Sequence, residues 1–275
     1  MTMATKTKTT YNMTTDAFHA PPYFVYGIAS GFVGVFVTFY LMRDVLVPNC
    51  TTPSFRKRVA RLKTRKDKNF FYITLPSMIH SLAHSCFHPR LISFGASPQH
   101  FADRVAFFDD TWPAFFQGVF VGYLAADFCL LGPVDLGPAY IVHHLSAMAI
   151  WSWSTCLGVM QWYASFLQFA EFSTIFLNLR QWVLTAGYPS DSPLAMGISL
   201  LFFATFFIVR VIPLPVLVIQ WVTFDFQKLL EEKGKVLAVA SSVTLTIHLL
   251  LQSFWFFLMV NKILRIVLSG SKKKK

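Results

Sequence analysis

Residues 138–156 read PAYIVHHLSAMAIWSWSTC, an apolar stretch that carries two adjacent histidines near its start. A helix that crosses a bilayer needs about 20 mostly apolar residues, and this stretch has that length without any Asp, Glu, Lys or Arg. Ionisable side chains inside a membrane are costly, so they usually face other protein groups rather than lipid. His143 and His144 therefore predict a membrane helix with polar partners inside the protein.

The composition of the whole chain agrees with a membrane protein. Apolar residues make up 55% and charged residues 13%, whereas a soluble domain carries about a quarter charged residues. Mean hydropathy is +0.51. Much of the net charge of +11 comes from the basic segment 56–68 and the four Lys of 272–275. Basic clusters beside membrane spans indicate the cytosolic side, so we expect no nucleic-acid partner.

Seven apolar stretches are long enough to cross a membrane: 23–47, 69–88, 112–131, 138–156, 160–185, 195–221 and 236–262. Only a few residues separate the fourth stretch from the fifth, which predicts a tight helical hairpin. Pro213 and Pro215 predict a kink in the sixth, because proline removes backbone hydrogen bonds. The predicted fold is an all-α integral membrane protein with about seven transmembrane helices.

The basic clusters also predict the orientation. Segment 48–68 is expected to be a cytosolic loop, which makes 1–22 a lumenal tail and, after seven crossings, 263–275 a cytosolic tail. Asn12 begins a glycosylation sequon, Asn-Met-Thr, on the predicted lumenal side. We therefore expect Asn12 to be glycosylated.

Polar side chains recur every three or four residues along several stretches, and this spacing places them on one helix face. The pattern predicts a shared polar interior with these members: Tyr123, Asp127, His144, Glu171, Thr174, Asn178, Arg210, His248 and Gln252. One interpretation is structural, since Ser, Thr, Asn and Gln often hydrogen-bond between membrane helices. The other is functional, because charged groups within membranes commonly mark sites. Both interpretations remain open for Glu171 and Arg210.

Two further histidines raise the question of a metal. His80 and His84 are four residues apart, the spacing by which one helix offers two imidazoles to a metal ion. Membrane di-iron enzymes need several histidine boxes, and the chain has no His-x-x-His-His sequence. It also lacks Gly-x-Ser-x-Gly and a Gly-rich phosphate loop. We expect no metal and no bound cofactor.

Three segments and the stretch around Arg210 resemble the TLC-domain family: GYLAADF (122–128), IVHHLSAMAIW (141–151) and EFSTIFLNLRQW (171–182). That family includes the ceramide synthases, the translocating-chain-associating membrane protein, a neuronal ceroid lipofuscinosis protein and TLC-domain-containing lipid regulators. The resemblance covers roughly 65–265. It implies a six-helix TLC domain over 69–262 with a central polar cavity, preceded by one extra helix at 23–47. It also implies residence in the endoplasmic reticulum membrane and work on lipids.

One departure separates this chain from the ceramide synthases. Those enzymes follow the histidine pair with a His-Asp…Asp run in the next span, whereas residues 167–180 here read LQFAEFSTIFLNLR, without His or Asp. The sequence is therefore nearest the branch that lacks ceramide synthase activity. Asp127, His143 and His144 match the polar cavity positions of the family, and Glu171, Asn178 and Arg180 match the pattern of the lipid regulators.

Three functions are compatible with this resemblance. The first is a role in lipid homeostasis, in which the protein binds or helps to process a membrane lipid or acyl chain. The second is an acyltransferase with acyl-CoA as co-substrate, in which His144 or His143 acts as nucleophile or base and Asp127 or Glu171 orients it. The third is a cargo receptor that cycles between endoplasmic reticulum and Golgi. Lys272 and Lys273 occupy the positions of a dilysine retrieval signal that coat proteins bind. The oligomeric state stays open.

Overall fold

The computed structural model describes residues 20–87, 111–132, 137–157 and 159–272, with the side chains of a few of them left aside. These residues form helices and contain no strand. The first four helical units are α1 (Pro22–Tyr40) continued by η1 (Leu41–Leu46) and α2 (Val47–Cys50), then α3 (Pro53–Ala60), α4 (Arg65–Phe87) and α6 (Thr111–Leu131). Next come α7 (Pro138–Cys156) and a helix made of α8 (Gln161–Gln168), η3 (Phe169–Glu171) and α9 (Phe172–Thr185). The last are a long helix of α10 (Pro193–Phe206), η4 (Phe207–Val211), α11 (Pro213–Gln220), η5 (Trp221–Asp225) and α12 (Phe226–Lys233), and finally α13 (Lys235–Lys272).

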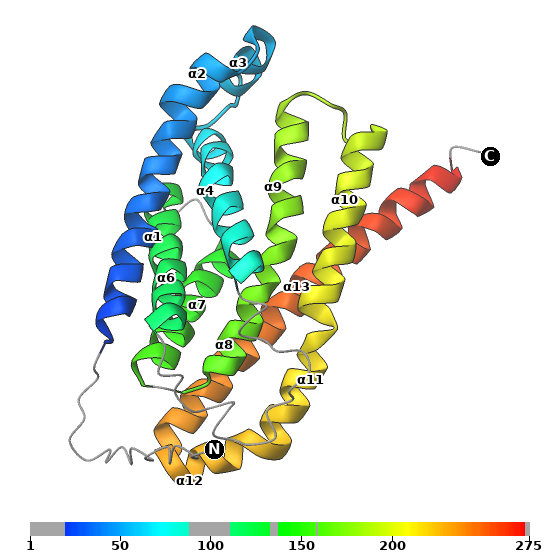
Figure 1. Ribbon diagram of the computed structural model, residues 1–275. Helices are drawn as coiled ribbons and strands as arrows, with labels where there is room; N and C mark the ends of the chain where they lie inside the picture. The colour runs from blue at the N-terminus through cyan, green and yellow to red at the C-terminus, as the bar shows by residue number, and fades with distance from the viewer. Residues whose placement is uncertain (1–19, 88–110, 133–136, 158, 273–275) are drawn as a thin grey trace, which may run out of the picture.

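The described helices coincide with the predicted spans and confirm an all-α membrane protein. Four of them are long and apolar enough on their own to cross a membrane: Pro22–Cys50, Ala114–Leu131, Pro193–Lys233 and Lys235–Arg265. The helices α4, α7 and α8–α9 do not reach that hydropathy, because they carry many of the polar side chains of the interior. Figure 1 shows the helices side by side, with α13 crossing the others obliquely.

In Figure 1, α3 and the last described turns of α13 lie at one end of the molecule, while α1 begins at the other. Arg58 of α3 donates a hydrogen bond to the backbone carbonyl of Ala186, which links α3 to the turn between α9 and α10. The orientation of the chain in the membrane stays a prediction.

Two segments outside the predicted spans are largely helical. In 48–68, Thr52 caps α3, and Thr64 and Asp67 bond reciprocally to each other's backbone N–H before α4. That reciprocal pair is a capping box, which explains why α4 begins at Arg65 rather than at 69. The sixth helix likewise continues past 221 to Lys233 and turns only at Gly234, whose φ of +87° suits glycine.

Glycines bring α1 and α6 into backbone contact. A Cβ added to Gly27 or Gly31 would lie 2.2 Å from a carbonyl oxygen of α6, and one added to Gly118 would lie 2.2 Å from a carbonyl oxygen of α1. Gly27 meets Phe115, and Gly31, one turn later in α1, meets Val119, one turn later in α6. The two helices are therefore parallel. Each helix carries a Gly-x-x-x-Gly pair, a spacing that permits close approach of membrane helices. Both pairs are visible in the sequence, but this helix contact was not among the expectations drawn from it.

We expect Gly31→Ala to weaken this contact, because the new Cβ would overlap the carbonyl of Val119 and force the helices apart. Overpacking of this kind lowers the free energy of unfolding by about 1–3 kcal/mol. Thermal unfolding of the purified protein in detergent measures the effect. Gly34→Ala is the matched control, because nothing lies within 4 Å of a Cβ added there. Equal melting temperatures for the two variants would contradict the proposed packing.

Candidate functional site

The polar side chains that the sequence singled out lie inside the bundle. Within the described residues, these members of the predicted polar interior are buried: Tyr123, Asp127, His144, Glu171, Asn178, Arg210, His248 and Gln252. Thr174 is partly buried. The buried polar residues of α4 are Thr74, Ser77, His80, Ser81 and His84. The helical spacing of polar residues was therefore a sound guide to which faces point inward.

Asp127, Tyr140 and His144 form a hydrogen-bonded group that joins α6 to α7. His144 Nε2 lies 2.8 Å from Asp127 Oδ2, and the Tyr140 hydroxyl donates to the same oxygen. The Asp127 and His144 side chains are 1% and 3% exposed. His144 Nδ1 lies 3.1 Å from the backbone carbonyl of Tyr140, one helical turn earlier. Tyr140 was not among the predicted site residues, although its position four residues before His144 places it on the same face.

In this geometry both ring nitrogens of His144 are engaged in hydrogen bonds. A carbonyl oxygen only accepts, so Nδ1 carries a hydrogen toward Tyr140, and Nε2 shares a proton with Asp127. An imidazole held on both sides is well suited to positioning α7 against α6. It is poorly suited to nucleophilic attack, which requires a free nitrogen lone pair. The catalytic assignment of His144 stays a prediction, and the geometry does not favour it.

Arg210 joins three helices through its guanidinium group. Its Nε donates to the Ala170 carbonyl at 3.1 Å and to Ser173 Oγ at 2.8 Å. Its two terminal nitrogens donate to Gln252 at 3.3 Å, to Thr174 at 3.1 Å and to Glu171 at 3.5 Å. Glu171 and Arg210 therefore form a buried ion pair. Most of the donors of Arg210 are occupied by protein, which favours a structural role.

Both members of this ion pair lie where the helix geometry changes. Glu171 ends the 3₁₀ turn η3, and Arg210 lies in the π turn η4 just before Pro213. A π turn contains one residue more than the α-helical turn it replaces, and such turns recur at functional sites. The extra residue rotates the next part of the helix by about 100°. The proline kink predicted for the sixth helix therefore takes the form of a π turn that also aims Arg210 inward.

Further hydrogen bonds tie α4 and α10 to α9. Asn178 donates to Ser77 at 3.0 Å, and the indole of Trp182 donates to Thr74. Arg180 donates to Ser199 of α10 at 2.9 Å. These contacts fit the structural interpretation of the stripe on the fifth span, in which polar groups connect neighbouring helices.

A different group of polar nitrogens lies between α7 and α13. The ring of His248 lies 5.9 Å from that of His143 and 5.8 Å from that of Trp151, centroid to centroid. His248 Nδ1 lies 3.1 Å from the Thr244 carbonyl, so it carries the hydrogen, and Nε2 of the neutral ring is an acceptor. His248 Nε2, Trp151 Nε1 and His143 Nδ1 are buried and have no hydrogen-bond partner within the described part of the chain. Buried polar atoms of this kind call for a partner.

Aromatic rings continue this row toward α4. Trp151 lies 4.6 Å from Phe120, and His80 stacks on Tyr123 at 4.1 Å with the rings nearly parallel. His80 and His84 are also 4.1 Å apart. In the part of the chain that is described, no three His, Cys, Asp or Glu side chains gather as a metal would require. The i, i+4 histidines instead belong to an aromatic lining of the interior.

Buried polar contacts also occur where none was expected. Asp225 lies beyond the predicted sixth stretch, yet it is fully buried at the end of η5 and accepts a hydrogen bond of 2.6 Å from Tyr163. Gln117 of α6 accepts hydrogen bonds from Ser154 and Thr155 of α7. Asp225 is buried because the sixth helix continues beyond the apolar stretch that predicted it.

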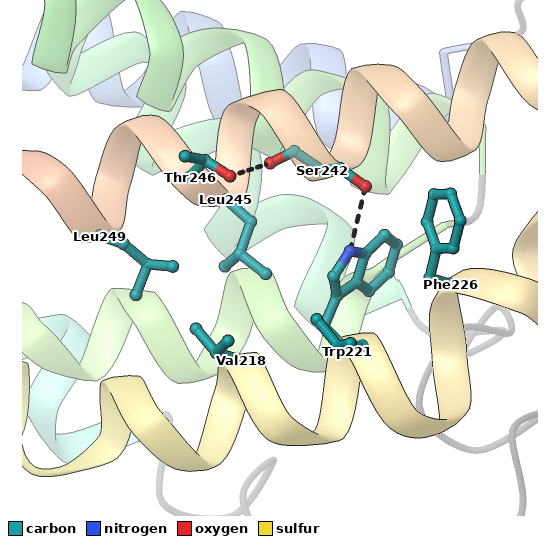
Figure 2. A pocket seen from close by; sticks show the side chains of 8 residues that line it. Val218, Trp221, Phe226, Ser242, Leu245, Thr246 and Leu249 are labelled. Atoms are coloured by element: carbon teal, nitrogen blue, oxygen red, sulfur yellow. Dashed lines mark hydrogen bonds between the residues drawn. The ribbon is translucent and has the colours of Figure 1, made fainter.

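Two hollows border the sixth helix, and the central polar cavity stays a prediction. The hollow beside Arg210 and Gln252 measures about 10 Å³, which is about the space that one water molecule needs. A larger pocket of about 230 Å³ lies between α11–η5 and α13, and Figure 2 shows its lining. Asn12 and Lys273 lie outside the described residues, and Lys272 ends α13 with its side chain not described.

We expect Arg210→Met to destabilise the protein strongly, because it leaves the buried carboxylate of Glu171 without its cation. Removing one partner of a buried ion pair costs about 3–5 kcal/mol. Adding Glu171→Gln should recover part of this loss, so that the double-mutant cycle gives a coupling energy of roughly 0.5–3 kcal/mol. Unfolding in detergent micelles measures all three variants. Arg43→Gln, which breaks the exposed Arg43–Asp44 pair, is the control and should change little. Additive effects at positions 171 and 210 would show that the pair is not coupled.

Comparisons with known proteins agree with this architecture. A family profile described as the TLC domain matches residues 23–261, so the match includes the first helix as well as the later ones. TLC domain-containing protein 4-B of Danio rerio is 24% identical over 259 residues, which cover 91% of this chain and 93% of the relative. Its namesake in Xenopus laevis is 34% identical over 98 residues, 34% of this chain and 37% of the relative. TLC domain-containing protein 4-A of Xenopus laevis is 30% identical over 110 residues, which cover 39% of this chain and 43% of the relative.

The division into one extra helix and a six-helix domain stays a prediction. With the profile matching most of its length and the polar interior arranged as described, the chain belongs to the TLC domain family.

Proposed function

We propose that this protein binds a membrane lipid inside its helical bundle and acts in lipid homeostasis in the endoplasmic reticulum membrane. The observation that carries the proposal is one cluster of buried nitrogens that have no partner among the described residues: His248 Nε2, Trp151 Nε1 and His143 Nδ1. A nearby hydrogen-bonded group, Asp127–Tyr140–His144, is satisfied by the protein itself. The interior thus combines a self-contained structural part with a part that can still accept and donate hydrogen bonds.

The chemistry of these nitrogens describes the ligand. His248 Nε2 accepts a hydrogen bond when its ring is neutral, and the indole N–H of Trp151 can only donate. A hydroxyl or amide group both donates and accepts, so it can satisfy both nitrogens at once. The surrounding rings of Phe120, His143 and Trp255 offer an apolar and aromatic environment. We therefore favour a lipid whose polar part carries a hydroxyl or an amide.

Acyl transfer is the second candidate function. His144 has both ring nitrogens engaged, so the role of base or nucleophile would fall to His143, whose Nδ1 is unpartnered among the described residues. Acyl-CoA would be the co-substrate, and a lipid amine would accept the acyl group. Turnover of acyl-CoA by the purified protein distinguishes an acyltransferase from a protein that only binds lipid.

We expect His248→Phe and Trp151→Phe each to reduce the amount of lipid that co-purifies with the protein by roughly threefold to tenfold, the effect of losing one hydrogen bond. Mass spectrometry of lipid extracted from equal amounts of purified protein measures this. Trp182→Phe is the matched control, because it also removes an indole N–H, but one that bonds to Thr74 inside the protein. Equal lipid content in wild type and in all three variants would refute the binding site.

The cargo-receptor alternative depends on the C-terminal lysines. We expect Lys272→Ser combined with Lys273→Ser to shift the protein from the endoplasmic reticulum to later compartments, because coat proteins read a dilysine pair at these positions. Fluorescence microscopy of the tagged protein, with the tag at the N-terminus, measures the shift. Lys274→Ser with Lys275→Ser removes the same charge and is the control. Unchanged localisation of the first variant would identify the tail as a basic patch at the membrane surface.

A further inference from the structure

The larger pocket opens between two membrane-spanning helices rather than into the polar centre. Its volume is about 230 Å³, and its lining combines Val218, Trp221 and Phe226 on one side with Leu245, Thr246 and Leu249 of α13 on the other. Figure 2 shows these side chains facing one another across the space between the two helices. Val222 also lines the pocket and is 69% exposed, so the groove opens on the outer, apolar face of the bundle. We call it the α11–α13 groove.

The path of the sixth helix explains why a groove forms there. This helix contacts α13 at η4 and again at α12, on either side of α11. The π turns η4 and η5 bracket α11, and Pro213 and Pro215 lie in its first turn. Each extra residue of a π turn rotates the next segment by about 100°, so α11 does not continue the packing of its neighbours. The groove is therefore a consequence of the backbone and not of one missing side chain.

The polar groups of the groove are already satisfied by the protein. The indole of Trp221 donates to Ser242 Oγ at 3.0 Å, and Ser242 Oγ donates to the Ala238 carbonyl at 2.8 Å. Thr246 Oγ1 donates to the Ser242 carbonyl at 2.8 Å. None of the lining residues is charged. The groove thus presents an apolar surface, which suits a hydrocarbon chain and gives a lipid headgroup little to bind.

A smaller hollow also borders the sixth helix. It is lined by residues of α8, η3, η4 and α11 together with Gln252 of α13, and it shares no lining residue with the groove. The groove is therefore a site of its own, apart from the hollow beside Arg210.

We propose that the α11–α13 groove binds one acyl chain of a membrane phospholipid. This goes beyond the proposed function, because the groove shares no residue with the polar centre and its occupation does not depend on a lipid bound there. The occupant is a hydrocarbon chain because the groove is apolar, uncharged and open to the membrane. Its volume has room for several methylene groups, and burial of each contributes about 0.8 kcal/mol.

Photocrosslinking of the full-length protein tests this proposal. The protein is reconstituted in phosphatidylcholine vesicles with a small fraction of phosphatidylcholine that carries a diazirine near the end of one acyl chain. After irradiation, peptide mass spectrometry locates the adducts. We expect them to concentrate on 218–226 and 242–249, above the level at equally exposed apolar positions such as Leu200 and Phe257.

A matched pair of variants completes the experiment. Leu249→Trp fills the groove and should lower the adducts there by about fivefold or more, as expected when burial of one or two methylene groups is lost. Leu250→Trp adds the same indole at the neighbouring position, which is 65% exposed and outside the lining, and should leave the adducts unchanged. Equal melting temperatures of the two variants verify that both fold.

The outcomes separate this inference from the proposed function. Adducts spread evenly over the exposed helices, or unchanged by Leu249→Trp, would overturn the groove as a specific site. Crosslinks between two copies of the chain in place of lipid adducts would overturn it as well. If adducts gather in the groove while His248→Phe leaves the amount of co-purified lipid unchanged, the groove is supported as a lipid site and lipid binding in the polar centre is refuted. If His248→Phe lowers the amount of co-purified lipid and no adducts form in the groove, lipid binding in the polar centre is supported and the groove site is refuted.

Discussion

The guanidinium group of Arg210 must be satisfied inside a bundle of apolar helices, and much of the interior is arranged around that requirement. It draws the Ala170 carbonyl, Ser173, Thr174 and Glu171 from one helix and Gln252 from another. A charged group that found no such partners would be expensive in a membrane. The 3₁₀ turn at Glu171 and the π turn at Arg210 are the local distortions that bring these groups together. The same π turn helps to separate α11 from α13.

The buried polar residues fall into two sets with different consequences. One set is paired within the protein and connects helices, as Asp127 with His144 and Asn178 with Ser77 do. The other set, His143, His248 and Trp151, retains ring nitrogens that no described residue satisfies. Satisfied pairs stabilise one arrangement of the helices, whereas unsatisfied nitrogens favour a ligand that completes them. The two adjacent histidines therefore differ: His144 is hydrogen-bonded within the protein, whereas His143 Nδ1 has no partner among the described residues.

The bundle has both a seam where two helices touch closely and a seam where they stand apart. Glycines let α1 and α6 meet backbone to backbone, where no lipid can enter. Between α11 and α13 the helices part instead, and the space is lined by apolar side chains. Lipid tails are as apolar as leucine, so helix association in membranes depends on close packing and hydrogen bonds. The α11–α13 seam has the hydrogen bond from Trp221 to Ser242 but lacks close packing, so a lipid chain can compete with protein there.

Hydropathy and helical spacing are local properties, so the amino-acid sequence was enough to predict the helical class, the positions of the spans and the inward faces of Glu171, Asn178, His248 and Gln252. It also contained the family resemblance and the Gly-x-x-x-Gly pairs. Which polar groups meet is known from the tertiary structure alone. The spacing in one helix does not show that Tyr140 completes the Asp127–His144 pair or that Tyr163 reaches Asp225. Nor does it reveal the π turns, whose extra residues change the helical phase and open the α11–α13 groove. Those features depend on contacts between residues far apart in the chain, which no local pattern contains.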